Sequence, residues 1–583
     1  MKYLIEIAKK ERLLVFIYLA LGIGIELLNS FSANYYQSLI DRFNNSTINF
    51  HIIFIYGTVL VTLCLLRYID EYPGRRLEHS FFLDLKLKAL EKMSKIDYLE
   101  YQMLGTGKLI QKIENGANAG RNIFFNFLLA VVRKIIPSIL FSMVFIYRID
   151  KKVMFTILIG YFIVFIITNL LIKALYQIKE HILINEEKMN HFLVRGFVEM
   201  VVFRVNKRFE YEICQSKFAK KEIIDSRVKM TLIHEAFFTI FSLIVTFIKM
   251  LIIVYSWKTK TISIGSIIAL ITLLDNAYTP IAIFNVLYIQ FKLDKAAYKR
   301  YTDILELNND GQLLAGKEVN LMYGNIEFNE ISFLYNNKRE IFNKLSLSIK
   351  SGEKVAIVGE SGSGKSTLIK LLIGLLKPSE GTIFIDDYNL LEMNLNSYYN
   401  YVTYVSQDSP IFDGTLRENI VFGKTIKSND IIEVLEKVGL KNLYLKLEAG
   451  LDTKLGEKGT TLSGGEKQRL ALARLWFSDA KIIILDEATS ALDNITEEKV
   501  MLNVMEFLKD KTTIMIAHRF NSIKNVENII VLKEGSIIGS GSFKKLLDGN
   551  LYFRELYYTC LLYTSRAHET DSYLVCRLLL EKK

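Results

Sequence analysis

Residues 359–367 have the types and the spacing that are needed to hold a chain of phosphates. They read Gly-Glu-Ser-Gly-Ser-Gly-Lys-Ser-Thr, which fits the pattern of a glycine, four residues, and then Gly-Lys-Ser. The apolar segment Lys354–Val358 precedes them and the helix-like segment Leu368–Leu376 follows. A strand, a glycine-rich loop and a helix are therefore predicted in this order, with backbone N–H groups of the loop wrapped around a triphosphate.

Two side chains in this loop have predicted tasks of their own. Lys365 is expected to reach the β- and γ-phosphates, and the Ser366 hydroxyl is expected to bind Mg²⁺. The predicted nucleotide-contacting residues of the loop are Gly359, Glu360, Ser361, Gly362, Ser363, Gly364, Lys365, Ser366 and Thr367.

Two adjacent carboxylates, Asp486 and Glu487, follow the apolar run 482–485. Such a run is typical of a buried parallel strand, and ligands bind at the carboxyl ends of strands in parallel sheets. Asp486 is expected to hold Mg²⁺ through water, and Glu487 is expected to polarise an attacking water. The carboxylate pair alone would be a weak signal, but the phosphate loop about 120 residues upstream supports its assignment to the same site.

A third segment, Leu462–Arg469, reads Leu-Ser-Gly-Gly-Glu-Lys-Gln-Arg and is expected to open a helix. Ser463 is a candidate N-cap, and the glycines after it expose backbone N–H groups. The segment lies between the phosphate loop and the Asp-Glu pair, where it resembles the signature of the ATP-binding cassette (ABC) family. Glu466 stands where glutamine is commoner in that family.

The resemblance implies roles for further residues. Gln407 is similar to the Q-loop glutamine, a contact of Mg²⁺ and water, and Tyr335 is similar to the A-loop aromatic residue that stacks on adenine. His518 resembles the switch histidine that contacts the γ-phosphate. Ser490–Asp493 resembles the D-loop, and Thr453–Gly459 resembles the X-loop of exporters.

The resemblance also implies cofactors and a partner. ATP and Mg²⁺ are the implied cofactors, and the partner is a second half-transporter subunit, because in this family the signature faces the phosphate loop of another subunit. A homodimer is favoured since every motif is intact, and a heterodimer remains an alternative. The implied sets are Glu487, His518 and Gln407 for catalysis, Ser366, Gln407 and Asp486 for Mg²⁺, and Ser463, Gly464, Gly465 and Glu466 for ATP in trans.

The first half of the chain is apolar enough to cross a membrane repeatedly. The 583 residues carry a net charge of +11, and their mean hydropathy of +0.23 is unusual for a soluble protein of this length. About 20 helical residues span a bilayer core. Six runs near that length are predicted to do so: 13–34, 51–70, 126–147, 152–173, 232–256 and 263–290.

Basic residues set the expected orientation in a cell membrane (inner or plasma). The segments 71–121 and 173–230 hold about 21 Lys and Arg, whereas the opposite loops 35–50, 148–152 and 257–262 hold six. Both termini, the two long loops and the ATPase domain are therefore predicted to be cytoplasmic. Six spans exclude a soluble nucleic-acid-associated ATPase, although the net charge would suit nucleic acid.

The predicted architecture is multidomain, with an all-α six-helix transmembrane domain followed by an α/β P-loop cassette. The boundaries are 1–300 for the transmembrane domain, 301–320 for a linker, 321–560 for the cassette, and 561–583 for a non-native or unstructured tail that resembles nothing in the family. The long cytoplasmic segments are expected to be helical. Asp97–Gly107 and 195–210 resemble coupling regions, whose tips should dock beside the Q-loop.

The predicted function is ATP-driven export of a drug, lipid or peptide-like substrate by alternating access. Uptake of a metal chelate by an exporter-like fold and a non-transporting membrane ATPase with a regulatory role are the alternatives. Charged residues within spans are costly and suggest function. Glu26 and Asp275 are candidates that could favour cations, and the alternative for them is a pair with a neighbouring helix or a position at the membrane edge. Lys249 and His234 are candidates for structural pairs. Arg67, Arg133 and Lys134 are expected to extend to the nearest membrane face.

Overall fold

A computed structural model shows two compact units. One comprises residues 1–94 and 104–307, and the other comprises residues 95–103 together with the chain from Asn308 onward. The structure describes residues 1–104, 106–260, 262–320, 323–335, 339–456, 459, 462–517, 519–524 and 526–559, without the side chains of 106–108, 165, 168–173, 198, 282, 285, 339 and 521.

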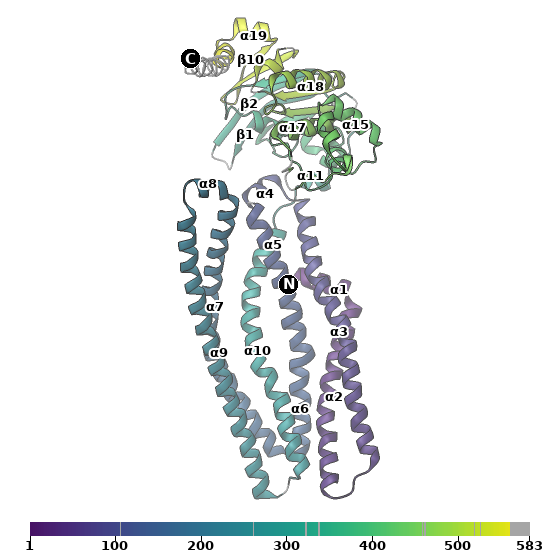
Figure 1. Ribbon diagram of the computed structural model, residues 1–583, viewed down its shortest axis with the longest axis vertical. Helices are drawn as coiled ribbons and strands as arrows, with labels where there is room; N and C mark the ends of the chain where they lie inside the picture. The colour runs from purple at the N-terminus through teal and green to yellow at the C-terminus, as the bar shows by residue number, and fades with distance from the viewer. Residues whose placement is uncertain are drawn as a thin grey trace, which may run out of the picture. The chain divides into compact units, whose positions relative to one another are not determined.

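The first unit, here the helical unit, consists of long helices that run side by side (Figure 1). Side-chain caps begin three of them: Asn49, Asp150 and Ser263 each accept hydrogen bonds from backbone N–H groups of the first turn. The helices are α1 (Lys2–Lys10), α2 (Arg12–Asn44), α3 (Phe50–Met93), α5 (Thr106–Arg121), the π-helical η1 (Asn122–Leu129) and η2 (Val131–Ile135), α6 (Ile136–Ile149), α7 (Lys151–Val198), α8 (Met200–Val205), α9 (Phe209–Thr259) and α10 (Ile264–Leu305).

Several of these helices can cross a membrane. By length and composition, five described segments qualify, and they contain five of the six predicted spans to within one residue at the ends of those spans. The remaining prediction, 152–173, lies in α7, where several side chains lie outside the described residues. The qualifying segments are Arg12–Asn44, Phe50–Met93, Leu109–Ile149, Phe209–Thr259 and Ile264–Leu305.

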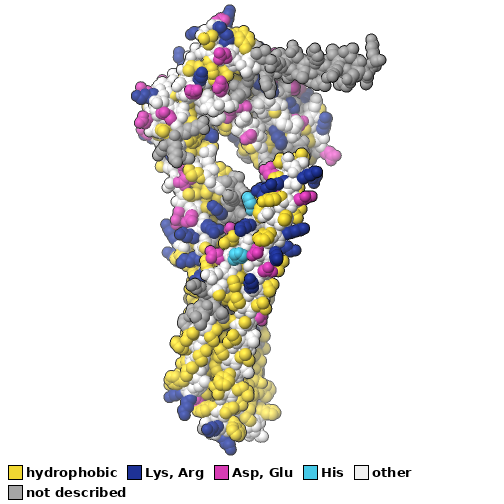
Figure 2. All heavy atoms as spheres, turned by 90° about the vertical axis from the view of Figure 1, so that its left-hand side faces the viewer, with side chains coloured by type: hydrophobic (Ala, Val, Ile, Leu, Met, Phe, Trp, Pro, Cys, Tyr) yellow, Lys and Arg dark blue, Asp and Glu magenta, His cyan; other side chains and the backbone are white. Residues whose placement is uncertain are grey.

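The helices extend far beyond a bilayer core, as the sequence predicts. α7 has 48 residues and α9 has 51, more than twice the length that a bilayer core requires. Apolar side chains cover one half of this pair, and charged side chains gather along the other half and at the far tip (Figure 2). In the polar half, Arg227 and Glu186 form an ion pair of 2.5 Å between the two helices.

One tyrosine organises three helices of this unit. Tyr301 of α10 is fully buried, and its hydroxyl donates to the backbone oxygen of Leu85 in α3 at 2.6 Å. Gly116 of α5 lies against the same ring, where a Cβ would stand 2.1 Å from the Tyr301 Cβ. The absence of a side chain at Gly116 therefore allows α5 to approach α10 closely.

The second unit, here the cassette, contains two sheets. The four-stranded sheet has the order β2-β1-β4-β5, and the six-stranded sheet has the order β10-β9-β3-β8-β7-β6. β6, β7, β8, β3 and β9 are parallel neighbours, and β10 adds an antiparallel edge. The strands are β1 (Ile326–Tyr335), β2 (Arg339–Ile349), β3 (Lys354–Val358), β4 (Glu380–Ile385), β5 (Tyr388–Asn389), β6 (Val402–Val405), β7 (Ile482–Asp486), β8 (Thr512–Ile516), β9 (Asn528–Lys533) and β10 (Ser536–Gly541).

The helices of the cassette cover these sheets. The α-helices are α11 (Gly311–Leu314), α12 (Lys365–Leu372), α13 (Leu395–Tyr398), α14 (Leu416–Val421), α15 (Ser428–Lys437), α16 (Lys441–Lys446), α17 (Gly464–Ala473), α18 (Asn494–Phe507) and α19 (Phe543–Gly549), with short 3₁₀ turns at Leu390–Glu392, Gly450–Asp452, Arg474–Phe477 and Phe520–Ile523.

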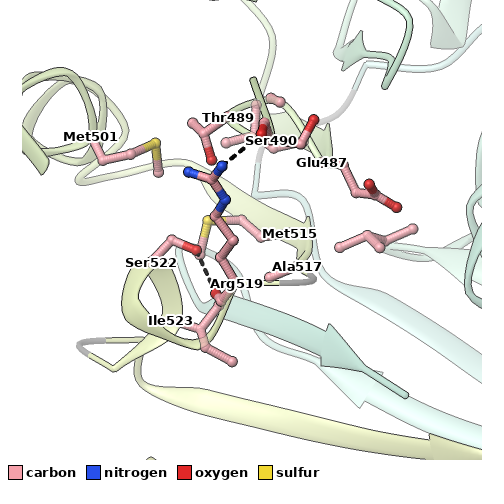
Figure 3. A pocket seen from close by; sticks show the side chains of 12 residues that line it. Glu487, Thr489, Ser490, Met501, Met515, Ala517, Arg519, Ser522 and Ile523 are labelled. Carbon is pink, nitrogen blue, oxygen red and sulfur yellow. Dashed lines mark hydrogen bonds between the residues drawn. The ribbon is translucent and has the colours of Figure 1, made fainter. Parts of the chain in front are cut away.

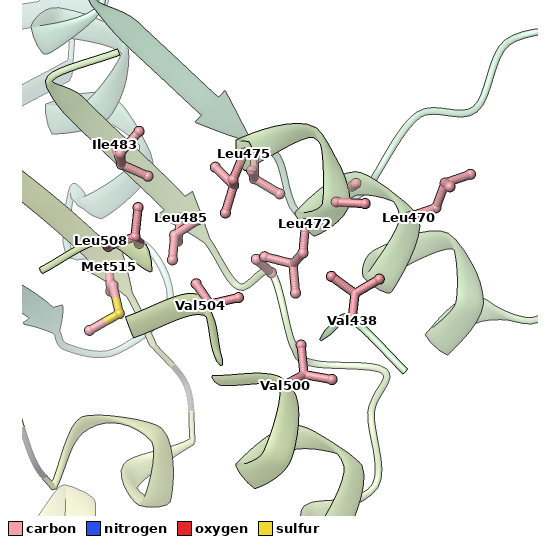
Figure 4. Packing of buried hydrophobic residues seen from close by; sticks show 14 of the residues in the cluster. Val438, Leu470, Leu472, Leu475, Ile483, Leu485, Val500, Val504, Leu508 and Met515 are labelled. Atoms are coloured by element: carbon pink, nitrogen blue, oxygen red, sulfur yellow. The ribbon is translucent and has the colours of Figure 1, made fainter. Parts of the chain in front are cut away.

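Strand β7 shows why its sequence is apolar without alternation. Ile483 and Leu485 face a core that includes Leu472, Val504 and other helical residues (Figure 4). Ile482 and Ile484 face the second core on the opposite side of the sheet. Since both faces of the strand are buried, every side chain in it must be apolar until the strand ends at its carboxylate.

The segment Lys95–Met103 groups with the cassette and contains most of α4 (Tyr98–Leu104). The Asp97 N–H donates to the Asn308 backbone oxygen at 3.1 Å, and Tyr98 and Leu99 pack on the core beneath the four-stranded sheet. Lys370 of α12 lies 5.6 Å from the centre of the Tyr98 ring. The first predicted coupling region thus contacts the helix that follows the phosphate loop.

The contact at Gly116 gives a test of helix packing. Gly116→Ala should lower the apparent melting temperature of the full chain in detergent, because overpacking a well-packed interface costs about 1–3 kcal/mol. Gly24→Ala is the matched control, since a Cβ there meets nothing within 4 Å. Thermal shifts followed by size-exclusion chromatography would measure both, and equal melting of the two variants would contradict the packing described.

Candidate functional site

The six-stranded sheet places the predicted phosphate loop and the predicted carboxylates at one edge. β3 pairs with β8, and β8 pairs with β7, so that Ile357 and Asp486 both lie opposite Ile516. The phosphate loop follows β3, and Glu487 follows β7. Because parallel strands end at the same edge, loop and carboxylates meet there.

Two glycines of the phosphate loop are enclosed by neighbouring atoms. A Cβ on Gly359 would stand 2.2 Å from the backbone oxygen of Leu532, and a Cβ on Gly364 would stand 2.8 Å from the Phe342 ring. Gly364 also has φ +109, a conformation that L side chains rarely adopt. The Ser363 hydroxyl is buried and has no hydrogen-bond partner among the described residues. This cradle fits a polyphosphate.

Lys365 is buried at the start of α12 and directed back onto the loop. Its ammonium donates to the backbone oxygens of Gly359 at 2.7 Å and Glu360 at 2.9 Å. Burial lowers the pKa of this ammonium, whereas the carboxylates of Glu487 and Asp486 oppose that change. The lysine is therefore held inside the loop, within the field of the carboxylates at the adjacent strand end.

The two predicted carboxylates have distinct contacts. The Gln407 side-chain amide donates to Glu487 Oε2 at 2.9 Å, which joins the Q-loop to the predicted catalytic base. The Tyr404 hydroxyl donates to Asp486 Oδ2 at 3.1 Å, and burial, followed by the charge of Asp486, raises the pKa of Tyr404. Glu487 has φ +48, which is uncommon for a residue with a side chain and occurs at strained functional sites.

The donors available for a metal suit Mg²⁺. Among the described residues, no three His, Cys, Asp or Glu side chains lie together as a metal cluster. The predicted ligands are instead one hydroxyl, one amide and one carboxylate: Ser366, Gln407 and Asp486. Mg²⁺ usually keeps several waters and uses one or two carboxylates together with substrate phosphates, so this set fits it.

The signature segment forms a complete N-terminal cap. The Ser463 hydroxyl accepts from the Glu466 N–H at 3.3 Å, and the Ser463 N–H donates to Glu466 Oε2 at 2.8 Å. Partial burial opposes ionisation of Glu466, but hydrogen bonds from Ser463 outweigh it and lower the pKa of the carboxyl. The unusual glutamate thus supports helix α17 directly. In the described part of the chain, no hydrogen bond of Ser463–Glu466 reaches the phosphate loop.

Two side chains that sequence reasoning did not single out hold the D-loop. Gln468 is buried, donates to the Ser490 hydroxyl at 2.8 Å, and accepts from the Ala491 N–H at 2.7 Å. Arg519 donates to the backbone oxygens of Ser490 at 2.8 Å and Leu492 at 2.5 Å. These hydrogen bonds therefore connect the D-loop to the signature helix and to the residue after His518.

Arg519 and Glu487 both line a small cavity (Figure 3). The cavity has a volume of about 40 Å³, and its apolar wall includes Met501, Met515 and Ile523. The guanidinium forms an additional ion pair with Glu497 at 3.0 Å. Only the adjacency of Arg519 to His518 in the sequence could have drawn attention to it.

Two further predicted site residues are Tyr335 and His518. Tyr335 ends β1, is partly buried, and stacks edge-on against Phe333 at 4.9 Å. His518 lies outside the described residues, as do parts of the X-loop segment and the tail 561–583. Tyr335 and His518 therefore stay predictions.

Comparison with known proteins agrees with this geometry. A family model described as "ABC transporter" matches residues 342–490, which include the phosphate loop, Gln407, the signature and Glu487. The chain is 38% identical over 297 residues to an uncharacterized ABC transporter ATP-binding protein of Bacillus subtilis, and 44% identical over 239 residues to the mitochondrial iron-sulfur clusters transporter of Chaetomium globosum.

Those two matches cover 50% and 40% of this chain, and 52% and 39% of the relatives. The chain thus matches about half or less of their length. A longer match, 27% identical over 501 residues, covers 84% of this chain and 85% of an ATP-dependent lipid A-core flippase of Alcanivorax borkumensis.

The fold is that of an exporter. A bacterial Atm1-family ABC exporter with ATP bound superimposes with a TM-score of 0.80, 22% identity, and coverage of 95% of this chain and 98% of that chain. The chain therefore contains an ABC transporter domain at residues 342–490, which follows a helical domain with the fold of an ABC exporter in the same polypeptide.

The contacts of Arg519 give a test of the D-loop. Arg519→Lys keeps the charge but cannot reach all three acceptors. Hydrogen bonds to charged groups contribute about 1.5–3 kcal/mol, so kcat for ATP hydrolysis should fall about ten- to a hundredfold. The dissociation constant for ATP should stay within about twofold, because Arg519 is not a predicted nucleotide contact.

Steady-state ATPase assays and nucleotide-binding titrations of the full chain in lipid would measure these values. Lys499→Gln is the matched control, since this exposed lysine makes no hydrogen bond or ion pair among the described residues. An unchanged kcat for Arg519→Lys would show that the D-loop contacts have no part in turnover.

Proposed function

We propose that the protein is an ATP-driven membrane transporter that exports a drug, lipid or peptide-like substrate from the cytoplasm. The observation that carries this proposal is the contact between Gln407 and Glu487 at the strand edge that holds the phosphate loop. It places a candidate for water activation beside a triphosphate cradle. Apolar helices in the same chain supply the membrane path.

In the proposed site, each residue has a defined task. Lys365 and the loop N–H groups bind the β- and γ-phosphates, and bound phosphate oxygens replace the loop carbonyls that Lys365 now contacts. Ser366, Gln407 and, through water, Asp486 would hold Mg²⁺, which would supply positive charge to neutralise the phosphates. Glu487 accepts the proton of the attacking water.

The remaining site residues are proposed from the family pattern. Tyr335 stacks on adenine, and His518 contacts the γ-phosphate. The proposed loop contacts to ATP are Gly359, Glu360, Ser361, Gly362, Ser363, Gly364, Lys365, Ser366 and Thr367.

The site is completed by a second subunit. Ser463, Gly464, Gly465 and Glu466 contact ATP that is bound to the phosphate loop of the partner. Support comes from the side-chain hydrogen bonds of Ser463 and Glu466, which join these two residues to each other. Within the described part of the chain, none of them reaches the phosphate loop. A homodimer is the favoured assembly because phosphate loop, signature, Glu487 and His518 are all present in this chain.

Hydrolysis changes the helical domain through the coupling regions. Lys370 and Tyr98 support this step, since their contact joins the helix after the phosphate loop to the connection between α3 and α5. Loss of the γ-phosphate then changes the angle between α3 and α5, which continue into the membrane. Other nucleotide-driven switches also respond to the loss of this phosphate.

The protein is proposed to lie in the inner or plasma membrane as a multi-pass protein. Its termini and cassette are on the cytoplasmic side, which the lysine and arginine distribution favours. The proposed domains remain 1–300, the linker 301–320, the cassette 321–560, and a non-native or unstructured tail 561–583.

ATPase activity of the full chain in proteoliposomes tests the catalytic part of this proposal. Mg²⁺-dependent, vanadate-sensitive hydrolysis is expected, and Glu487→Gln should reduce kcat at least a hundredfold, because general-base catalysis contributes about 10²–10⁴. Lys499→Gln serves as the control. Hydrolysis that persists unchanged in Glu487→Gln would contradict the assignment of the base.

Direction is tested with inverted membrane vesicles and isotopically labelled cell extract. ATP-dependent accumulation inside wild-type vesicles, absent with Glu487→Gln, is the result expected for export. ATP-dependent loss from preloaded vesicles would instead establish uptake. No flux despite intact ATPase activity would favour a regulatory membrane ATPase.

A further inference from the structure

The helical unit contains a polar cavity among helices that are otherwise apolar. It has a volume of about 450 Å³ and lies between α2, α3, η2, α6 and α10. Three bases and three acids line it. These charged residues are Arg67, Arg133 and Lys134 and the acids Glu26, Asp70 and Asp275.

Arg133 is fixed within the wall of this cavity. Its guanidinium pairs with Asp70 of α3 and lies 3.6 Å from the centre of the Tyr18 ring. A Cβ on Gly22 would overlap the Arg133 side chain at 2.0 Å, so the glycine makes room for the arginine across α2. Arg133 is thus a structural part of the wall, and Asp70 is its counter-ion.

Arg133 and Lys134 both belong to η2, a π-helical turn. A π-helical turn shifts the rotation of the residues that follow it, and such turns occur frequently at functional sites. Ser138, one turn further on, donates to the Asn276 backbone oxygen at 2.8 Å and ties this helix to α10 beside the cavity.

The acids of the cavity are largely neutralised. Asp275 forms an ion pair of 2.7 Å with Lys249 of α9, a residue that is not part of the lining. Asp70 is neutralised by Arg133. Among the described residues, Glu26 is then the one lining acid without an ion pair.

The two remaining bases have no acidic partner within the described part of the chain. Arg67 donates to the Asn29 side-chain oxygen at 3.1 Å, and Lys134 makes no hydrogen bond or ion pair there. Subtracting the two neutralised acids and Arg133 leaves two positive charges against the single negative charge of Glu26. The lining of the cavity therefore has a net positive charge.

This arrangement corrects two sequence-based expectations. Glu26 and Asp275 do line one cavity, but the pairing of Asp275 with Lys249 removes the acidic character that would favour cations. Arg133 does not extend to the membrane face, because Asp70 and Tyr18 hold it. Lys249 forms the structural pair that the sequence suggests.

An uncompensated charge among membrane helices is costly, and it marks a ligand site when it faces a cavity. We propose that this cavity binds substrates through an anionic group, a carboxylate or a phosphate, which Arg67 and Lys134 contact. Ile25, Pro280 and Ile283 contact an apolar body attached to that group. This inference rests on the proposed transport function and assigns its substrate class.

Pyrene derivatives provide a matched test of charge. Pyrenebutyrate, pyrenebutanol and pyrenebutylamine share an apolar body and differ in their charged group. Saturable binding to the full chain in phosphatidylcholine nanodiscs, above that to empty discs, is measured by fluorescence. We expect pyrenebutyrate to bind at least about tenfold more tightly than pyrenebutylamine.

Variants then assign the contact. Arg67→Gln and Lys134→Gln should each weaken pyrenebutyrate binding about fivefold or more and leave pyrenebutanol unchanged. Lys152→Gln, at the start of α7 and outside the cavity lining, is the matched control. Equal or tighter binding of the amine, or no loss in either variant, would overturn the proposal.

Two further measurements identify the source of the anion and show which of the two proposals a negative result contradicts. Competition by phosphatidylglycerol in the discs would identify a lipid headgroup as occupant, and its absence would identify a soluble amphiphile; both outcomes support an anion site. Binding is measured without hydrolysis, so loss of ATPase activity would contradict the transport proposal alone. Gel filtration and ATP titration of each variant confirm that it is folded.

Discussion

The approach of backbone to phosphate is the constraint on which the cassette depends. A triphosphate can be wrapped by N–H groups only if the loop has no side chains in the way, and the packing at Gly359 and Gly364 leaves no room for them. The atoms that fill this space are the Leu532 carbonyl, from strand β9 beside β3, and the Phe342 ring, from strand β2. The parallel order then brings Asp486 to the same edge as the loop. The chemistry is thus a consequence of sheet register and of where glycine is required.

The helical unit meets a different constraint, because charges in a membrane need partners. Arg133 has one in Asp70, and Asp275 has one in Lys249. The space that Gly22 leaves for Arg133 shows how a small residue on one helix fixes a charge from another. Arg67 and Lys134 have no acidic partner among the described residues, and the structure has a cavity beside them in place of packed side chains. The ion pairs and the cavity together define the region that we propose to discriminate ligands by charge.

Local and distant features differed in how well the sequence predicted them. The phosphate loop, the signature cap and the β7 carboxylates are contiguous, so their motifs carry the necessary information. The roles of Gln468 and Arg519 depend on contacts with a D-loop more than 20 residues away, and no pattern in one sequence encodes such a contact. The charge of the membrane cavity also escaped prediction, because it depends on which acids are paired across helices. Asp275 is an acid in the sequence, but Lys249 neutralises it in the fold.

The proposed function requires that ATP is enclosed between the phosphate loop of one chain and the signature of another. The most direct test is disulfide cross-linking of a cysteine-free chain that carries Glu487→Gln with Ser361→Cys and Ser463→Cys. In the presence of ATP and an oxidant, we expect a covalent dimer that forms only when both cysteines are present. ATP binding without any inter-chain cross-link would contradict it.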